Sequence, residues 1–266
     1  GRVANLLFEK ELITLNSFIS RIGGKKLLSK EIIRRFPNSY PERYIEVFGG
    51  AGWVMFALDK IAKLEVFNDI DGQLINLFRC VKYHCGELQR EINWVLNSRE
   101  MFLDFRELQT YNGLTDIQHA AIYFILIKES YGSDTRSFGC GKRNMIGAAE
   151  YLSGVQKRLQ KTVIENKDFE SLIKTYDRQK ALFYLDPPYH GTEKYYDNTF
   201  SKEDHYRLNL VLKQIKGKFI LSYNDDDFIR NLYKDFNIES ITRQNNLLMK
   251  NKHGDRQFQE LIIKNY

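Results

Sequence analysis

The tetrad Asp186-Pro187-Pro188-Tyr189 combines residue types that suit chemistry on an aromatic amino group. An amino group such as that of adenine is a poor nucleophile because its lone pair is delocalised into the ring. Two acceptors that hold both N–H groups favour a pyramidal nitrogen, and the Asp186 carboxylate and Pro187 carbonyl can supply them. Proline suits this position because its fixed φ keeps the carbonyl aimed. Tyr189 offers a flat face on which a base could stack, worth about 1–3 kcal/mol.

An ordinary Asp-Pro-Pro turn with an incidental tyrosine is the alternative, so a second motif has to decide. Phe48-Gly49-Gly50-Ala51-Gly52 follows an apolar run and opens a helical pattern. Glycine permits positive φ and close approach of a ligand to the backbone. The spacing matches neither GxGxxG nor GxxxxGK[ST], which disfavours a dinucleotide or a nucleoside triphosphate. A ribose-linked amino acid ligand fits, with Asp69 placed to bind ribose hydroxyls, although a glycine turn without a ligand remains the alternative.

Both motifs stand at the ends of apolar runs that are typical of strands. Strands are expected at 44–48, 64–68, 181–185 and 218–222, with a further pair at 236–242 and 259–263. Helical spacing follows several of them, and Ser201 with Asp204 forms a capping-box pattern before a helix from about Lys202. Alternating strands and helices predict a parallel α/β sheet, which binds ligands at the carboxyl ends of its strands.

The middle of the chain has a different pattern. Residues 73–127 are mostly helical in spacing, and the apolar block 120–127 suits a buried helix, whereas residues 131–147 have the composition of a loop or hairpin. We therefore expect a mainly helical insert at 76–154 within a catalytic domain formed by 1–75 and 155–266.

Charge points to an anionic partner. The net charge is +6 and the pI is near 9.0, with a local excess of +4 over residues 133–161 and +3 over residues 243–256. Clustered Lys and Arg attract phosphates, whether in nucleic acid or on an acidic membrane surface. No apolar run approaches the roughly 20 residues that span a bilayer, and the start lacks a secretory segment. We expect a soluble cytoplasmic protein with no membrane partner.

Cysteine and histidine give weaker signals. Cys80 and Cys85 lie in a helical pattern and are expected to be buried apolar groups, and the three cysteines lack the spacing of a zinc site, so no metal is predicted. His190 adjoins the tetrad and is expected to form a polar pocket wall. His205 is expected on the surface of a helix.

Six ordered segments together resemble the Dam-type (D12 class) DNA adenine-N6 methyltransferases, in which a cofactor loop, a target-recognition insert and the tetrad follow in that order. The segments are Ile22–Lys26, Glu46–Gly52, Asn68–Asp71, Asn166–Phe169, Asp186–Tyr189 and Ser222–Asp225. The resemblance implies a Rossmann-like S-adenosylmethionine-dependent methyltransferase sheet with a mainly helical target-recognition insert. It also implies methyl transfer from S-adenosyl-L-methionine to N6 of a flipped adenine in a specific double-stranded DNA site.

Site residues follow from the resemblance, position by position. The matches for cofactor binding are Gly23, Gly24 and Lys25 in an N-terminal loop, Glu46, Phe48 and Gly49 in the cofactor loop, Asp69 for the ribose, Asp168 and Phe169 for the adenine, and Asp186. The matches for catalysis are Asp186, Pro187 and Tyr189. The candidates for DNA binding are Arg136, Lys142 and Arg143 in the basic insert and Phe200 in the segment that closes over the flipped base.

Residues 129–139 depart from the family because they lack its common Asn-Gly-Leu-containing stretch, so the reaction class is supported more firmly than a GATC target. For a DNA-modifying enzyme we also expect a cognate restriction endonuclease as a partner and a location at the nucleoid. The alternatives are a methyltransferase acting on RNA or a protein amide, a catalytically silent DNA-binding module and, least supported by the glycine spacing, a nucleotide-dependent oxidoreductase.

Overall fold

One mixed sheet organises the molecule. The computed structural model describes residues 15–20, 26–139, 144–191, 200–243 and 258–266. Within these ranges seven strands pair in the order β3-β2-β1-β4-β5-β7-β6. Their bounds are β1 Arg43–Glu46, β2 Leu64–Asn68, β3 Thr162–Glu165, β4 Ala181–Leu185, β5 Lys218–Asn224, β6 Asn237–Arg243 and β7 Phe258–Lys264.

Strand direction confirms the predicted fold class. β1 to β5 are mutually parallel, and β7 lies antiparallel between β5 and β6. The chain order reverses at β1, whose neighbours are β2 on one side and β4 on the other. Open α/β sheets bind ligands beyond the carboxyl ends of the strands at such a reversal point. The sheet is Rossmann-like, and the predicted tetrad and glycine turn both follow strands at the reversal.

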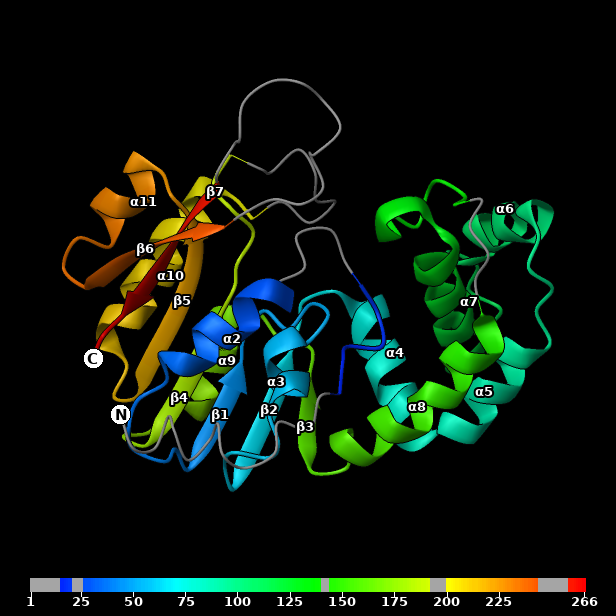
Figure 1. Ribbon diagram of the computed structural model, residues 1–266, viewed down its shortest axis with the longest axis horizontal. Helices are drawn as coiled ribbons and strands as arrows, with labels where there is room; N and C mark the ends of the chain where they lie inside the picture. Colours follow the sequence, from blue (N-terminus) through cyan, green and yellow to red (C-terminus); the bar gives the residue numbers. More distant parts are fainter. Residues whose placement is uncertain (1–14, 21–25, 140–143, 192–199, 244–257) are drawn as a thin grey trace.

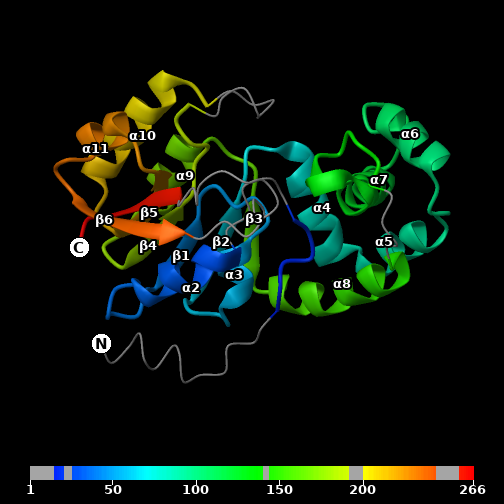
Figure 2. The same ribbon diagram turned by 45° about the horizontal axis from the view of Figure 1, so that its top comes forward.

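Helices cover both faces of the sheet. Figure 2 shows α2 and α3 on one face, with α9, α10 and α11 on the other. The helices are α2 Lys26–Arg34, α3 Trp53–Ala57, α9 Phe169–Tyr176, α10 Lys202–Gln214 and α11 Asp227–Leu232. Side chains alternate between the faces, so Leu182 and Tyr184 of β4 join the α2 side while Phe183 joins the opposite core. Burial on both sides explains why β4, with the sequence Ala-Leu-Phe-Tyr-Leu, carries no charged residue.

The middle of the chain forms a helical lobe beyond the β3 edge of the sheet (Figure 1). Its helices are α4 Gly72–Tyr83, α5 Cys85–Asn93, α6 Arg99–Leu108, α7 Asp116–Glu129, the short 3₁₀ helix η1 Tyr131–Ser133, and α8 Met145–Leu159. Residues 120–127 of α7 are all buried, as expected. The core of the lobe continues to Phe56 of α3 and Phe67 of β2, so the lobe and the sheet share apolar packing.

Local signals predicted several details and missed others. Ser201 and Asp204 form the expected capping box at the start of α10, and Cys80 and Cys85 are buried. Strand β3 was not predicted, because it is short and two of its four residues are only partly buried. Among the described residues, no helix has the length and apolar character needed to cross a membrane.

Candidate active site

Asp186 stands at the carboxyl end of β4. All five residues of this strand are buried, and it lies between β1 and β5. Pro187 is also buried, and its missing N–H prevents continuation of the hydrogen-bonded ladder. The hydroxyl of Ser222, on β5, donates to Asp186 Oδ1 at 2.8 Å. The carboxylate is therefore held at the reversal edge of the sheet by a neighbouring strand.

The glycine turn lies after the adjacent strand, β1. Gly50 and Gly52 have φ of 51° and 70°, a region that side-chain-bearing residues rarely adopt. A Cβ on Gly49 would overlap the Phe67 ring and lie 2.8 Å from the Asn68 carbonyl oxygen, whereas a Cβ on Gly50 would meet nothing within 4 Å. The turn is therefore packed tightly on its inner side and open above Gly50.

Residues at the end of β2 tie this turn to its neighbours. Asp69 accepts the Gly50 N–H at Oδ2 (2.8 Å) and the Asp71 N–H at Oδ1 (2.9 Å). The buried Asn68 side chain donates to the carbonyls of Val47 and Lys167, at 2.9 and 3.0 Å. The chain segments that follow β1, β2 and β3 are thus joined by side-chain hydrogen bonds. Sequence reasoning missed Asn68 because its role depends on segments distant in the chain.

Three phenylalanines meet beside the turn. The ring centroids of Phe48, Phe169 and Phe200 lie 5.6 to 5.7 Å apart. Arg207 of α10 lies over the Phe169 ring, 4.3 Å from its centroid, and donates to Asp168 Oδ2 at 2.7 Å. Asp168 also caps α9 by accepting the Glu170 N–H at 3.0 Å. The structure thus brings together Phe48, Asp168, Phe169 and Phe200, and it adds Arg207, which sequence reasoning missed.

Tyr189 and His190 are packed against β5 and α11. The ring centroids of Tyr189 and Tyr223 lie 6.3 Å apart. His190 Nδ1 lies 2.9 Å from Asp226 Oδ2, and its ring stacks on Phe228 with centroids 4.4 Å apart. His190 is half-buried and polar in its contacts, in keeping with a pocket wall.

The expectation for His205 was wrong. Its side chain is fully buried, and Nδ1 lies 2.6 Å from the Tyr223 hydroxyl. The helical spacing around His205 does not predict this contact. Its partner, Tyr223, lies on β5 of the sheet, and nothing in the sequence of α10 indicates which strand packs against it.

Glu46 is the last residue of β1 and is buried rather than at an open surface. It is 1% exposed, accepts a hydrogen bond from the Tyr44 hydroxyl at 3.2 Å, and is bonded by the Met55 backbone. Burial raises the pKa of Glu46 to about 8. Its place in the cofactor-binding set stays a prediction.

Arg136 lies on a compact loop at the end of α7. Ser130 and Phe138 form a β-bridge across the base of the loop, and Arg106 of α6 donates to the Arg136 carbonyl at 3.0 Å. Asp134 Oδ1 accepts the N–H groups of Arg136 and Ser137. The Arg136 side chain is exposed. Gly23, Gly24, Lys25, Lys142 and Arg143 lie outside the described residues.

The donors and shapes at this edge fit S-adenosylmethionine. The open side of the turn at Gly50 has room for a ligand against the backbone, and Asp69 lies beside it as an acceptor for hydroxyl groups. Phe48 and Phe169 present apolar rings next to the Asp168 carboxylate, a combination that suits a purine with an exocyclic amino group.

A Rossmann-like sheet with this glycine turn and an Asp-Pro-Pro-Tyr motif at its reversal point defines a methyltransferase-type domain. The D12 class N6 adenine-specific DNA methyltransferase family matches residues 22–247, and the chain belongs to this family.

One curated protein and one solved structure are similar to this chain over most of its length. The Type II methyltransferase M.CviBI of Paramecium bursaria Chlorella virus NC1A is 25% identical over 262 residues, 92% of this chain and 97% of that protein. The crystal structure of HI0767 from Haemophilus influenzae, named as a candidate methylase, aligns over 93% of this chain and 91% of its own, with a TM-score of 0.37 and 11% identity.

Proposed function

We propose that this protein transfers a methyl group from S-adenosyl-L-methionine to N6 of an adenine flipped out of a specific double-stranded DNA site. The observation that carries the proposal is the position of the Asp186 carboxylate, held by Ser222 at the sheet edge that also presents the glycine turn. Family membership supplies the adenine N6 acceptor and DNA as its carrier.

In this proposal the tetrad binds and aims the target amino group. The Asp186 carboxylate and the Pro187 carbonyl accept the two N6–H groups and stabilise the positive charge that grows on the nitrogen. Tyr189 stacks on the base, and its packing against Tyr223 fixes the ring in place. No covalent bond to the protein is needed, because the sulfonium methyl group is already a strong electrophile.

The cofactor contacts proposed for the described residues lie on both sides of β1. Gly49, Asp69 and Phe48 would hold the ribose and the amino acid chain against the turn, while Asp168 and Phe169 would bind the adenine. S-adenosylmethionine would supply the methyl group: the N6 lone pair forms the new N–C bond, the C–S electron pair stays on sulfur, and one N6–H proton leaves to restore a neutral amine. Glu46, at the end of β1, and Gly23, Gly24 and Lys25 complete the proposed set.

DNA would approach from the edge that carries the tetrad and engage the helical lobe. We assign 76–154 to target recognition and 1–75 with 155–266 to catalysis. Arg136, Lys142 and Arg143 would contact phosphates and base edges, and Phe200 would border the extruded base. Extrusion is required because N6 is enclosed in the duplex, and stacking in the pocket offsets the lost pairing.

M.CviBI is a Type II methyltransferase, so a cognate restriction endonuclease is a partner worth seeking. A DNA-modifying enzyme of this kind would act in the cytoplasm at the nucleoid.

Modification-sensitive sequencing of DNA from a host without adenine methylation tests the proposed site specificity. Cells expressing the wild-type protein should carry N6-methyladenine in one short motif, and cells expressing the Asp186→Ala variant should carry none. Methylation scattered without a motif would contradict a specific site. Unmodified DNA with methylated RNA or protein amides would move the substrate to those classes.

A further inference from the structure

Ser222 and Tyr223 carry the two hydroxyl groups in the buried stretch of β5, and the Tyr223 hydroxyl is bonded to His205. Residues Phe219 to Tyr223 are all buried, and Ser222 is 0% exposed. Leu185 pairs in register with Leu221, so Ser222 and Asp186 occupy the next positions on the two parallel strands. The sheet itself therefore sets these two side chains beside each other.

The contact has a defined direction. A carboxylate only accepts hydrogen bonds, so the Ser222 hydroxyl is the donor at 2.8 Å from Asp186 Oδ1. The hydroxyl also forms a side-chain hydrogen bond with Tyr184, and the Leu185 carbonyl oxygen is farther away, at 3.4 Å. Burying a hydroxyl among apolar residues is unfavourable unless it forms a good hydrogen bond. The Asp186 carboxylate provides that bond.

We propose that Ser222 is the positioning residue of the methyl-transfer site, holding the Asp186 carboxylate in the orientation in which it meets the substrate N6–H. The inference rests on the proposed function, because the substrate amino group is what the carboxylate would meet.

Two consequences follow from the bond. The hydroxyl fixes the plane of the carboxylate, which aligns the acceptor with the target nitrogen before the base arrives. It also favours the ionised carboxylate, the form that accepts N–H groups. Loss of the hydroxyl should therefore lower kcat and raise the pKa of Asp186. It should leave cofactor affinity unchanged, because the hydrogen-bond partners of Ser222 within the described residues are Leu185, Asp186 and Tyr184, none of which belongs to the glycine turn or to the group of Phe48, Phe169 and Phe200.

The test compares Ser222→Ala with Ser222→Thr in the full-length protein, using a duplex that contains the methylated motif. Removing a donor to a charged group should lower kcat about 10- to 100-fold. The KM for DNA and the Kd for S-adenosylhomocysteine should change less than about twofold. The acid limb of the kcat–pH profile should move to higher pH in Ser222→Ala, since activity is lost as pH falls through the raised pKa of Asp186. Ser222→Thr retains the hydroxyl and should restore most of kcat and the wild-type position of the acid limb.

Ser29→Ala is the matched control, because Ser29 is also a buried serine but lies on α2. The kcat and the pH profile of the Ser29→Ala variant should match those of the wild type. Wild-type kinetics in Ser222→Ala would overturn the proposal. Equal loss in the Ala and Thr variants without a shifted acid limb would also overturn it, since that pattern indicates a packing defect.

A readout independent of activity separates this inference from the proposed function. The carboxyl carbon of Asp186, identified in a ¹³C-aspartate spectrum by its absence in Asp186→Asn, should titrate at higher pH in Ser222→Ala than in the wild type. If the wild-type protein is inactive but the titration of Asp186 shifts in Ser222→Ala, the proposed function is refuted and the hydrogen bond between Ser222 and Asp186 is supported. If the titration of Asp186 does not shift, the role of this hydrogen bond is refuted, whatever the activity.

Discussion

Arg158 of α8 and Glu65 of β2 form an ion pair that fastens the helical lobe to the sheet. Arg158 Nη1 lies 2.7 Å from Glu65 Oε2, with the two side chains only 10% and 1% exposed. The same guanidinium donates to the carbonyls of Met55 and Leu58 at the end of α3, at 3.0 and 3.1 Å. Since Gly52 of the glycine turn is the N-cap of α3, one side chain connects the lobe to the proposed cofactor site.

Replacing Arg158 with Met should destabilise the protein strongly. The change leaves the Glu65 carboxylate buried without its cation, which typically costs about 3–5 kcal/mol. Urea unfolding measures the free energy directly, and Lys157→Met, an exposed neighbour on α8, should change it by less than about 0.5 kcal/mol. A loss in Arg158→Met no larger than that of the control would show that the ion pair does not hold the lobe.

Arg207 should affect cofactor affinity through Asp168 and Phe169. The Arg207→Met variant removes the bond to Asp168 and the cation over the Phe169 ring. Because the Arg207 side chain is 40% exposed and solvent screens its charge, we expect only about a 5-fold weaker Kd for S-adenosylhomocysteine by calorimetry.

The control for Arg207 is Lys213→Met on the same helix. Lys213 is 41% exposed and pairs with Asp235, away from the rings of Phe48, Phe169 and Phe200. Its Kd should match the wild type, and equal effects of both substitutions would rule out a specific role for Arg207.

Whether a site residue could be predicted from the sequence depends on how far along the chain its contact partners lie. The end of β4 was predicted because an apolar run meets Asp186 and two prolines, a purely local signal. The roles of Asn68 and Ser222 were not predictable, since each bonds a residue brought near by strand pairing. The error at His205 has the same origin, because helical spacing does not reveal a hydrogen-bond partner on β5.

The pH dependence of stability should report the burial of Glu46. Burial raises its pKa from 4.5 to about 8, so the folded protein keeps a proton on Glu46 that the unfolded chain releases. The free energy of unfolding therefore falls as pH rises from about 4.5 to about 8, and this contribution levels off above that range.

Glu46→Gln removes this contribution because the amide does not titrate. The stability of the variant relative to the wild type should rise steadily from pH 5 to pH 8, as measured by urea unfolding at each pH. Glu42→Gln should show no such rise, since Lys180 lowers the pKa of the exposed Glu42. A difference between Glu46→Gln and the wild type that does not vary with pH would contradict the assigned protonation.

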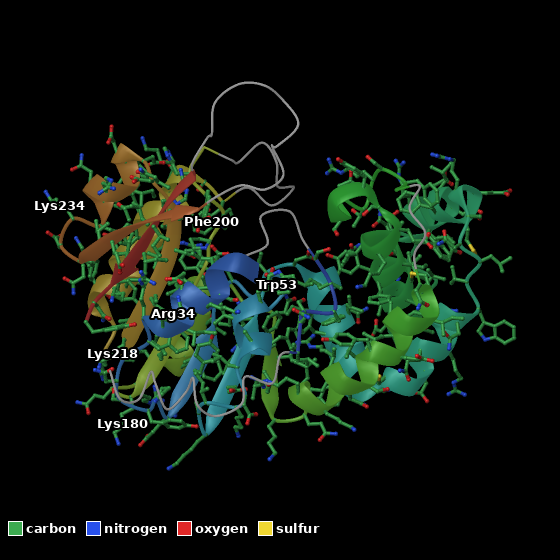
Figure 3. All side chains as sticks on the ribbon, in the orientation of Figure 1. Arg34, Trp53, Lys180, Phe200, Lys218 and Lys234 are labelled. Carbon is green, nitrogen blue, oxygen red and sulfur yellow. The ribbon has the colours of Figure 1, made fainter. Side chains whose placement is uncertain are left out.

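Arg136 should contribute to DNA binding through its charge. Arg136→Ala should weaken binding and reduce the slope of log K against log salt by about one, as expected for the loss of one phosphate contact. Lys180→Ala is the control, because Lys180 precedes β4 at the edge of the sheet opposite Phe200 (Figure 3). An unchanged slope in Arg136→Ala would remove this residue from the DNA interface.

The central claim is that this chain methylates adenine N6 in DNA through Asp186. The most direct measurement incubates the purified protein with unmethylated plasmid DNA and S-adenosylmethionine carrying a deuterated methyl group, then analyses the digested nucleosides by mass spectrometry. We predict deuterated N6-methyldeoxyadenosine with the wild-type protein and none with Asp186→Ala, although that variant should still bind S-adenosylhomocysteine. Label on cytosine alone, no label in the wild-type reaction, or undiminished label in the Asp186→Ala reaction would contradict the account.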